Sequence, residues 1–216
     1  MLEKSNNDNV YLYIYKGKIT QKVDADTGGA KSRTNKKGNV VNEINFKSVV
    51  GRLISFTFKN SEYGEQFSIG MQDGSEYFSI QIPVESSHFS TFVCRIDNVN
   101  FSEDIRIKSY DFEDKKTGKR KSGFVLYQNE DKIDPSINKD NIPKDYPEWK
   151  EGGTKNDVKY YYGLKTEWEV SFMKNKEWKF VPVAPGSTEA NIKKSFVSQG
   201  SNIEFQDFDK DNLGDD

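Results

Sequence analysis

The sequence has little of the equipment that catalytic or disulfide-bonded proteins use. Its 216 residues include one cysteine, Cys94, and one histidine, His88. A single cysteine cannot form an intramolecular disulfide, so a disulfide-stabilised scaffold is excluded and a reducing compartment is the simpler expectation. One histidine and one cysteine are also too few for a zinc site built from these two residue types. We therefore expect neither a cofactor nor a bound metal.

Motifs for covalent or phosphate chemistry are missing as well. His88 and Cys94 lie six residues apart, which on a helix separates them by about 120° around the axis, so they do not face each other. Neither the Gly-x-Ser-x-Gly nucleophile motif nor a P-loop motif occurs. We expect a protein that is not an enzyme.

Long apolar runs are absent too. No window approaches the 18 or so consecutive apolar residues that a transmembrane helix needs. Residues 1–7 are polar and lack the apolar core of a secretory signal. These absences predict a soluble, cytoplasmic protein that does not enter membranes.

What the sequence does contain is aromatic residues, 13% of the chain, in runs that alternate as strands do. Residues 53–58, 67–71 and 77–82 predict three strands, and Asp73-Gly74 is a hairpin turn signal. A short helix follows, with N-cap candidates at residues 85–87. Its apolar stripe is Phe89, Phe92, Val93 and Ile96. Residues 105–112 and 124–127 then predict a two-stranded hairpin.

Three strands, a short helix and two strands are the layout of an OB-fold. We therefore expect a mainly β protein with a five-stranded barrel over residues 40–133 and its helix between the third and fourth strands; a five-strand sandwich would give a similar pattern. Residues 10–14, 160–162, 168–172 and 178–183 predict extra strands from the N- and C-terminal segments. Residues 17–38 predict a mobile basic loop, residues 134–157 an irregular insertion and residues 188–199 a short helix. Residues 1–202 would form one domain.

The strand at residues 105–112 combines cations and rings on the face opposite Ile105 and Ile107. Cations can meet phosphates while rings stack on bases, a combination that suits single-stranded nucleic acid. The alternative is an ordinary solvated strand face. The candidate DNA-binding residues of this strand and the turn after it are Arg106, Lys108, Tyr110, Phe112, Lys119, Arg120 and Lys121.

A second candidate surface lies near the N-terminus. Residues 16–59 contain ten bases and three acids. The tyrosines of residues 10–15 share one strand face, on which they could stack on bases or pack under the C-terminal segment. The candidate DNA-binding residues here are Tyr11, Tyr13, Tyr15, Lys31, Arg33, Lys36 and Lys37.

The charge of the chain is divided unevenly. The last 14 residues hold six acids and one base, a net charge of −5, whereas the first 202 hold 31 bases and 28 acids, a net charge of +3. We expect residues 203–216 to form a disordered acidic tail, either for solubility or for recognition. Embedded apolar residues favour recognition. The candidate partner-binding residues are Phe205, Asp207, Phe208, Asp209, Asp211, Leu213, Asp215 and Asp216.

The strand order, the basic-aromatic strand and the acidic tail together resemble bacteriophage single-stranded DNA-binding proteins of the OB-fold type. The runs that carry the resemblance are Gly51-Arg52-Leu53-Ile54, Tyr63-Gly64-Glu65-Gln66-Phe67-Ser68-Ile69, Asp73-Gly74-Ser75-Glu76-Tyr77 and Gly118-Lys119-Arg120-Lys121-Ser122-Gly123-Phe124-Val125-Leu126-Tyr127-Gln128. The resemblance implies sequence-independent binding of single-stranded DNA in replication, recombination or repair, in the host cytoplasm. It also implies a tail that competes with DNA and recruits replication or recombination proteins. In the family the tail often ends in an aromatic or apolar residue, whereas this sequence ends Gly214-Asp215-Asp216.

Two other functions fit the same composition. A structural or protein-interaction β-domain, such as a virion component, would have no affinity for DNA. A carbohydrate-binding β-sandwich would present a planar aromatic platform, for which the candidates are Trp149, Trp168 and Trp178.

Overall fold

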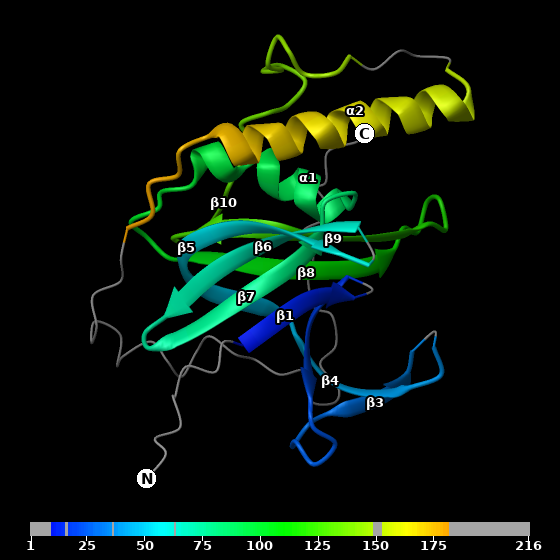
Figure 1. The fold of residues 1–216 in the computed structure, drawn as a ribbon, viewed down its shortest axis with the longest axis vertical. Coiled ribbons are helices and arrows are strands. Elements are labelled where there is room, and N and C mark those ends of the chain that lie inside the picture. The colour runs from blue at the N-terminus through cyan, green and yellow to red at the C-terminus, as the bar shows by residue number, and fades with distance from the viewer. Residues whose placement is uncertain (1–9, 16, 36, 63, 149–152, 182–216) are drawn as a thin grey trace.

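The computed structural model describes residues 10–15, 17–35, 37–62, 64–148 and 153–181. Within these ranges the chain is mainly β, with one mixed sheet of ten strands and few helices (Figure 1). The strands are β1 (Val10–Tyr15), β2 (Lys18–Val23), β3 (Lys31–Thr34), β4 (Val40–Phe46), β5 (Ser48–Ser61), β6 (Gly64–Asp73), β7 (Glu76–Pro83), β8 (Ile105–Glu113), β9 (Arg120–Gln128) and β10 (Asp131–Lys132). The helices are α1 (Ser87–Val93), the 3-10 turn η1 (Ile96–Asn98) and α2 (Lys155–Asn175).

The predicted three-strand meander is confirmed in β5, β6 and β7, which pair antiparallel in sequence order. The alternating residues Phe67, Ile69 and Met71 of β6 are completely buried. Gly74 lies in the turn between β6 and β7 with φ at 59°, a left-handed conformation that glycine adopts without strain. The hydrophobic period of two therefore located these strands and their inward faces.

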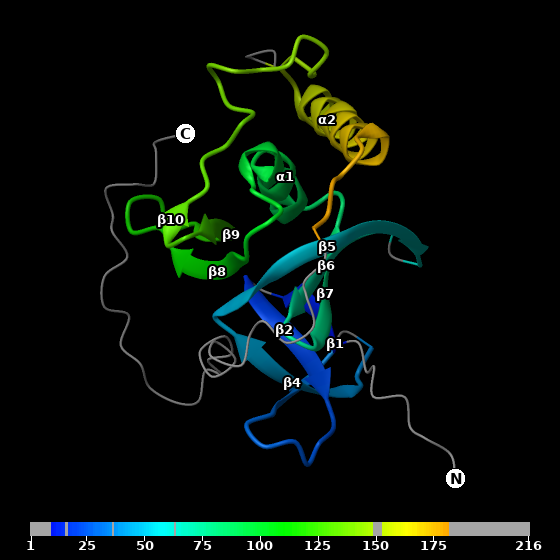
Figure 2. The ribbon, with the colours of Figure 1, turned by 90° about the vertical axis from the view of Figure 1, so that its left-hand side faces the viewer.

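The predicted helix and hairpin after the meander are also confirmed. Ser86 caps α1, because its side chain accepts a hydrogen bond from the backbone N–H of Phe89. Phe89, Phe92 and Val93 form the buried stripe of α1. β8 and β9 then pair antiparallel. In Figure 2, α1 lies between the strands and α2.

The predicted closed five-stranded barrel is wrong. β5 pairs with β8 over residues 48–51 and with β6 over residues 52–61, as the first strand of such a barrel would. However, β7 and β9 do not pair; the edge of β7 is taken by β1, which runs parallel to it with Leu12 beside Ile80. Both of these side chains are completely buried. The N-terminal strand thus brings apolar residues to the edge where the barrel would close, and the sheet stays open in the order β10-β9-β8-β5-β6-β7-β1-β2-β4-β3.

The N-terminal extension of the sheet is confirmed, but the predicted mobile loop at residues 17–38 is largely wrong. β2 and β3 occupy residues 18–23 and 31–34, and both pair with β4. Ile19 is completely buried, which anchors β2 in the core although its neighbours are polar. β3 and β4 extend from the body on the side opposite α2 (Figures 1 and 2).

The predicted C-terminal strands at residues 160–162 and 168–172 are wrong, because both segments belong to α2. The helix begins at a capping box, in which Thr154 accepts from the Asp157 N–H and the Asp157 carboxylate accepts from the Thr154 N–H. Trp168 stacks on Phe172 one turn later, with ring centroids 5.2 Å apart.

The other predictions for the C-terminal part of the chain are confirmed only in part. Residues 178–181 form no strand; instead Trp178 and Phe180 pack edge-on against Phe56 of β5. The irregular insertion predicted over residues 134–157 is confirmed for residues 134–148, but residues 155–157 already belong to α2. The predicted helix at 188–199 and the acidic tail at 203–216 lie outside the described residues.

Candidate nucleic-acid interface

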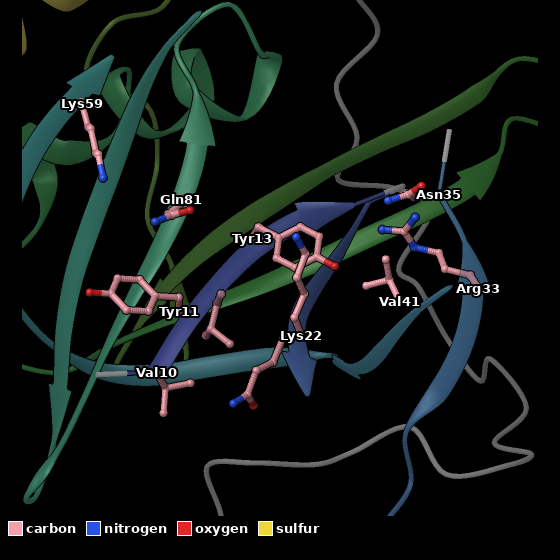
Figure 3. A pocket seen from close by; sticks show the side chains of 11 residues that line it. Val10, Tyr11, Tyr13, Lys22, Arg33, Asn35, Val41, Lys59 and Gln81 are labelled. Atoms are coloured by element: carbon pink, nitrogen blue, oxygen red, sulfur yellow. The ribbon is translucent and has the colours of Figure 1, made fainter. Parts of the chain in front are cut away.

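A groove of about 830 Å³ crosses the outer face of the sheet beside β1. Residues far apart in the sequence line it, because β1 lies between the meander and the β2–β4 strands. Figure 3 shows Lys59 and Arg33 at its two sides with Tyr11 and Tyr13 between them. We call this site the sheet groove. The residues that matter for its chemistry are Tyr11, Tyr13, Lys22, Arg33, Lys59 and Gln81.

The period of two in β1 places the tyrosines in the sheet groove. Leu12 and Ile14 pack into the core, so Tyr11 and Tyr13 face outward. The Tyr11 side chain is 58% exposed, far more than a core aromatic would be. Tyr13 is half-buried and lies beside Gln81 of β7. The side chain of Tyr15 lies outside the described residues.

A buried carboxylate holds one end of the sheet groove in place. The side chain of Glu43 in β4 accepts a hydrogen bond from the Tyr13 hydroxyl, and both of its oxygens accept from Arg33 Nε at 2.8 Å. Glu43 is only 4% exposed, and burial alone would raise its pKa. The hydrogen bonds from Arg33 and Tyr13 outweigh burial and hold the pKa of Glu43 below its ordinary value. The pKa of Tyr13 is raised, first by burial and then by its hydrogen bond to Glu43. The network therefore fixes the Tyr13 ring and the Arg33 guanidinium.

Two lysines add positive charge to the sheet groove; Lys22 lies across from Glu43, whose pKa its charge helps to lower. Lys22 Nζ lies 5.6 Å from the centre of the Tyr13 ring. Lys59 stands at the opposite side of the groove, on β5 (Figure 3). Among the described residues neither lysine has an ion-pair partner. Both ammonium groups can therefore meet an anionic ligand without first breaking a salt bridge.

The four predicted residues of β8 form a separate surface that does not line the sheet groove. They share one face of the strand, where the Tyr110 and Phe112 rings lie 5.8 Å apart. Arg106 donates to Glu130 at 2.6 Å and lies 5.0 Å from the centre of the Tyr127 ring. Tyr110 packs over Gly123, where an added Cβ would lie 2.5 Å from its hydroxyl. The assignment of Arg106, Lys108, Tyr110 and Phe112 to DNA stays a prediction.

The cations predicted around the β8–β9 turn are mostly engaged within the hairpin. Arg120 forms a two-pronged pair with Asp111, and Lys121 pairs with Asp114 at 2.8 Å. The hydrogen bond from Lys121, with others from backbone N–H groups, lowers the pKa of Asp114. Lys119 is exposed and makes no ion pair within the described part of the chain.

The remaining predicted cations likewise lie at different places and do not form one surface. Lys31 is exposed on β3. Lys37 pairs with Glu62 at 3.5 Å, which joins the β3–β4 turn to the β5–β6 turn. Lys36 and the tail residues lie outside the described residues.

Lys22, Glu43, Lys59 and Gln81 were missed as site residues. Lys22 and Lys59 belong to the basic region of residues 16–59, but the sequence predicts a loop where β2 lies and therefore gives no outward face to Lys22. The local signal for Lys22 is the apolar Ile19, three residues earlier. In a strand, residues three apart lie on opposite faces, so an inward Ile19 places Lys22 on the outward face. No local signal identifies Glu43, because its role depends on the pairing of β3 and β4.

The structure also shows the surroundings of His88 and Cys94, the residues that nucleophilic catalysis would need, and the arrangement of possible metal ligands. His88 packs against Phe124, with ring centroids 5.5 Å apart, and burial lowers its pKa. Burial raises the pKa of the Cys94 thiol. No group of three or more His, Cys, Asp or Glu side chains that could hold a metal occurs in the described ranges. Neither described helix has the length and apolar content needed to cross a bilayer.

The proposed carbohydrate platform finds no support in two of its three tryptophans. Trp168 packs between Tyr146 and Phe172, and Trp178 packs against Phe56 and Phe101. Trp149 lies outside the described residues.

Comparisons of the chain with protein-family models, with curated proteins and with solved structures find no match.

Proposed function

We propose that the protein binds single-stranded DNA in the sheet groove, without catalysis and without sequence preference, in replication, recombination or repair. The observation that carries the proposal is Tyr11, a ring 58% exposed in a groove that also contains Lys22 and Lys59. An exposed tyrosine beside two lysines that form no salt bridge within the described chain offers a base a flat surface and offers the flanking phosphates a charge.

The arrangement favours a flexible strand over a duplex. Tyr11, Tyr13, Lys22 and Lys59 come from three strands of one curved face, so the ligand has to expose its bases while its backbone follows the sheet. A duplex keeps its bases stacked inside and cannot present them to Tyr11. The polar side chains of the groove, such as Gln81, can contact any base, which suits binding that ignores sequence.

The test is fluorescence anisotropy of labelled oligo(dT) and of a matched duplex at several salt concentrations. Affinity for the single strand should exceed that for the duplex. The logarithm of the association constant should fall with the logarithm of salt, by about 0.7 for each phosphate contacted. Tyr11→Ala should weaken binding roughly tenfold, the loss of one stacked base. Tyr162→Ala is the matched control, because Tyr162 is similarly exposed at 57% but lies on α2.

Charge variants separate the sheet groove from the β8 surface. Lys22→Ala with Lys59→Ala should lower both the affinity and the salt slope, whereas Lys144→Ala, an exposed lysine of the irregular segment, should change neither. Lys108→Ala with Phe112→Ala tests the β8 surface in the same assay. If the β8 pair abolishes binding and the groove variants do not, the site is on β8; if the full chain shows no single-strand affinity at low salt, the proposed function is wrong.

A further inference from the structure

The first half of α2 exposes a face that no described element covers. Figure 1 and Figure 2 show α2 as the outermost helix on its side, with α1 beneath it and the irregular segment of residues 134–148 running beyond it. Tyr160 is 70% exposed and Leu164 37%, and the two lie about 40° apart around the helix axis. In contrast, Glu169 and Met173, in the second half of α2, are buried against the body. The exposed apolar side chains of α2 are thus concentrated in its first half.

Gly163 lies beside these residues, about 60° around the axis from Tyr160, and no contact within the described chain requires a glycine there. A Cβ added at Gly163 would meet no atom within 4 Å. Glycine inside a helix costs about 1 kcal/mol relative to alanine, so a position with open space around it would ordinarily carry a side chain. Glycine there allows close approach by something outside the protomer.

The charges around Gly163 are arranged for self-association. Lys159 lies four residues before Gly163 and Glu167 four residues after it, so the three positions form one ridge along the helix. Both charged side chains are exposed, and neither has an ion-pair partner among the described residues. If two copies of α2 cross antiparallel at Gly163, Lys159 of each lies level with Glu167 of the other, about 6 Å from the crossing point along the axis. The same crossing places Tyr160 of each copy on the same flank as Leu164 of the other, about 3 Å apart along the axis. A parallel crossing would instead set lysine against lysine and glutamate against glutamate.

We propose that a second copy of this chain docks on the outer face of α2, antiparallel, with the two helices crossing at Gly163. The contact is isologous, so the Lys159–Glu167 ion pair and the Tyr160–Leu164 contact each occur twice. A single helix crossing is a small interface, and we expect a dissociation constant in the micromolar range. This proposal does not depend on DNA binding, because none of its residues lines the sheet groove.

The test is sedimentation equilibrium of the full chain from about 1 to about 300 µM, without DNA. The wild type should change from monomer to dimer over this range. Gly163→Leu should abolish the dimer and leave the circular dichroism spectrum unchanged, because the added side chain meets open space in the protomer and leucine is a good helix former.

Charge reversal decides the orientation. Lys159→Glu and Glu167→Lys should each weaken association about tenfold, because each places like charges opposite one another twice, and the double reversal should restore it to within about threefold. Added salt should weaken the wild-type dimer and strengthen the single reversals. A wild type that stays monomeric at the highest concentration overturns the proposal, as does association that Gly163→Leu leaves intact. Single reversals without effect, or a double reversal that does not rescue, overturn it as well.

Discussion

At the scale of single residues, the Glu43 carboxylate links the stability of the sheet to the geometry of the sheet groove. It is buried, and it holds both Tyr13 and Arg33. A buried carboxylate with such partners stabilises the fold while it is charged. When either partner is lost, the carboxylate stays buried without its hydrogen bond and destabilises the fold. Substitutions in this network should therefore change folding and ligand binding to different degrees.

Glu43→Gln tests the pH dependence that follows from this network. The pKa of Glu43 lies below its ordinary value of 4.5 in the folded chain, so its contribution is fully present above 4.5 and is lost as the pH falls below that value. We expect Glu43→Gln to lower the free energy of unfolding by about 1–3 kcal/mol at about pH 7, and by less at about pH 3. Urea unfolding at both pH values measures this difference. An equal loss at both would show that the charge of Glu43 contributes nothing.

Tyr13→Phe separates the hydroxyl from the ring. The variant removes the hydrogen bond to Glu43 and keeps the aromatic face. Stability should fall by about 1 kcal/mol, with little change in affinity for single-stranded DNA. Urea unfolding and anisotropy on the same preparation provide the two measurements. A large loss of affinity with normal stability would mean that the hydroxyl itself contacts the ligand.

At the scale of elements, β5 determines the shape of the sheet because it has two partners. Gly51 pairs with Ile105 of β8, and the next residue, Arg52, pairs with Gln72 of β6. The backbones approach closely at this transfer: a Cβ on Gly51 would lie 2.8 Å from the carbonyl oxygen of Gln72 and 3.1 Å from the Phe78 ring. Only a residue without a side chain fits there.

Gly51→Ala should therefore destabilise the protein by about 1–3 kcal/mol through overpacking against backbone. Gly28→Ala is the matched control, since no atom lies within 4 Å of its added Cβ and its φ is not in the left-handed region. Thermal or urea unfolding of both variants measures the difference. A neutral Gly51→Ala would mean that β5 can shift away from β6 at no cost.

The elements also show where sequence reasoning succeeded and why it failed. The period of two identified β5 to β9 because one face of each strand packs in the core, as Phe67 and Ile80 do. It failed for α2, since tyrosines and tryptophans favour strands and the polar Lys165 lies on the inward side of the helix. The helical signal was the spacing of Val158, Tyr161, Trp168 and Phe172, together with the capping box at Thr154.

At the scale of the whole molecule, the open sheet could not be inferred from local patterns. Pairing of β7 with β1 or with β9 satisfies the same alternation, and the choice depends on which strand reaches the edge of β7. The sheet groove follows from that choice, since it brings Tyr11 beside strands of the meander. The sequence therefore predicts Tyr11, Tyr13 and Arg33 as candidates near the N-terminus, but local patterns do not place them with Lys22 and Lys59 in one groove.

The uneven charge of the chain gives a prediction at this scale. If residues 203–216, with a net charge of −5, compete with DNA for the cations of the sheet groove, a chain ending at Asn202 should bind oligo(dT) more tightly than the full chain. The difference should shrink as salt screens both interactions. Anisotropy of the two chains in parallel at low and high salt measures it. Equal affinity at low salt would contradict competition by the tail.

The parallel pairing of β1 with β7 also has a consequence for folding. Val10 meets Phe78 across 68 residues of chain, whereas β5, β6 and β7 are joined by short turns. Contacts between distant segments form slowly, because the entropy of closing a long loop opposes them until the rest of the sheet is in place. We therefore expect β1, which carries the tyrosines of the sheet groove, to dock last. In a refolding experiment we expect the circular dichroism signal of the sheet to recover first and the capacity to bind a single strand to return later.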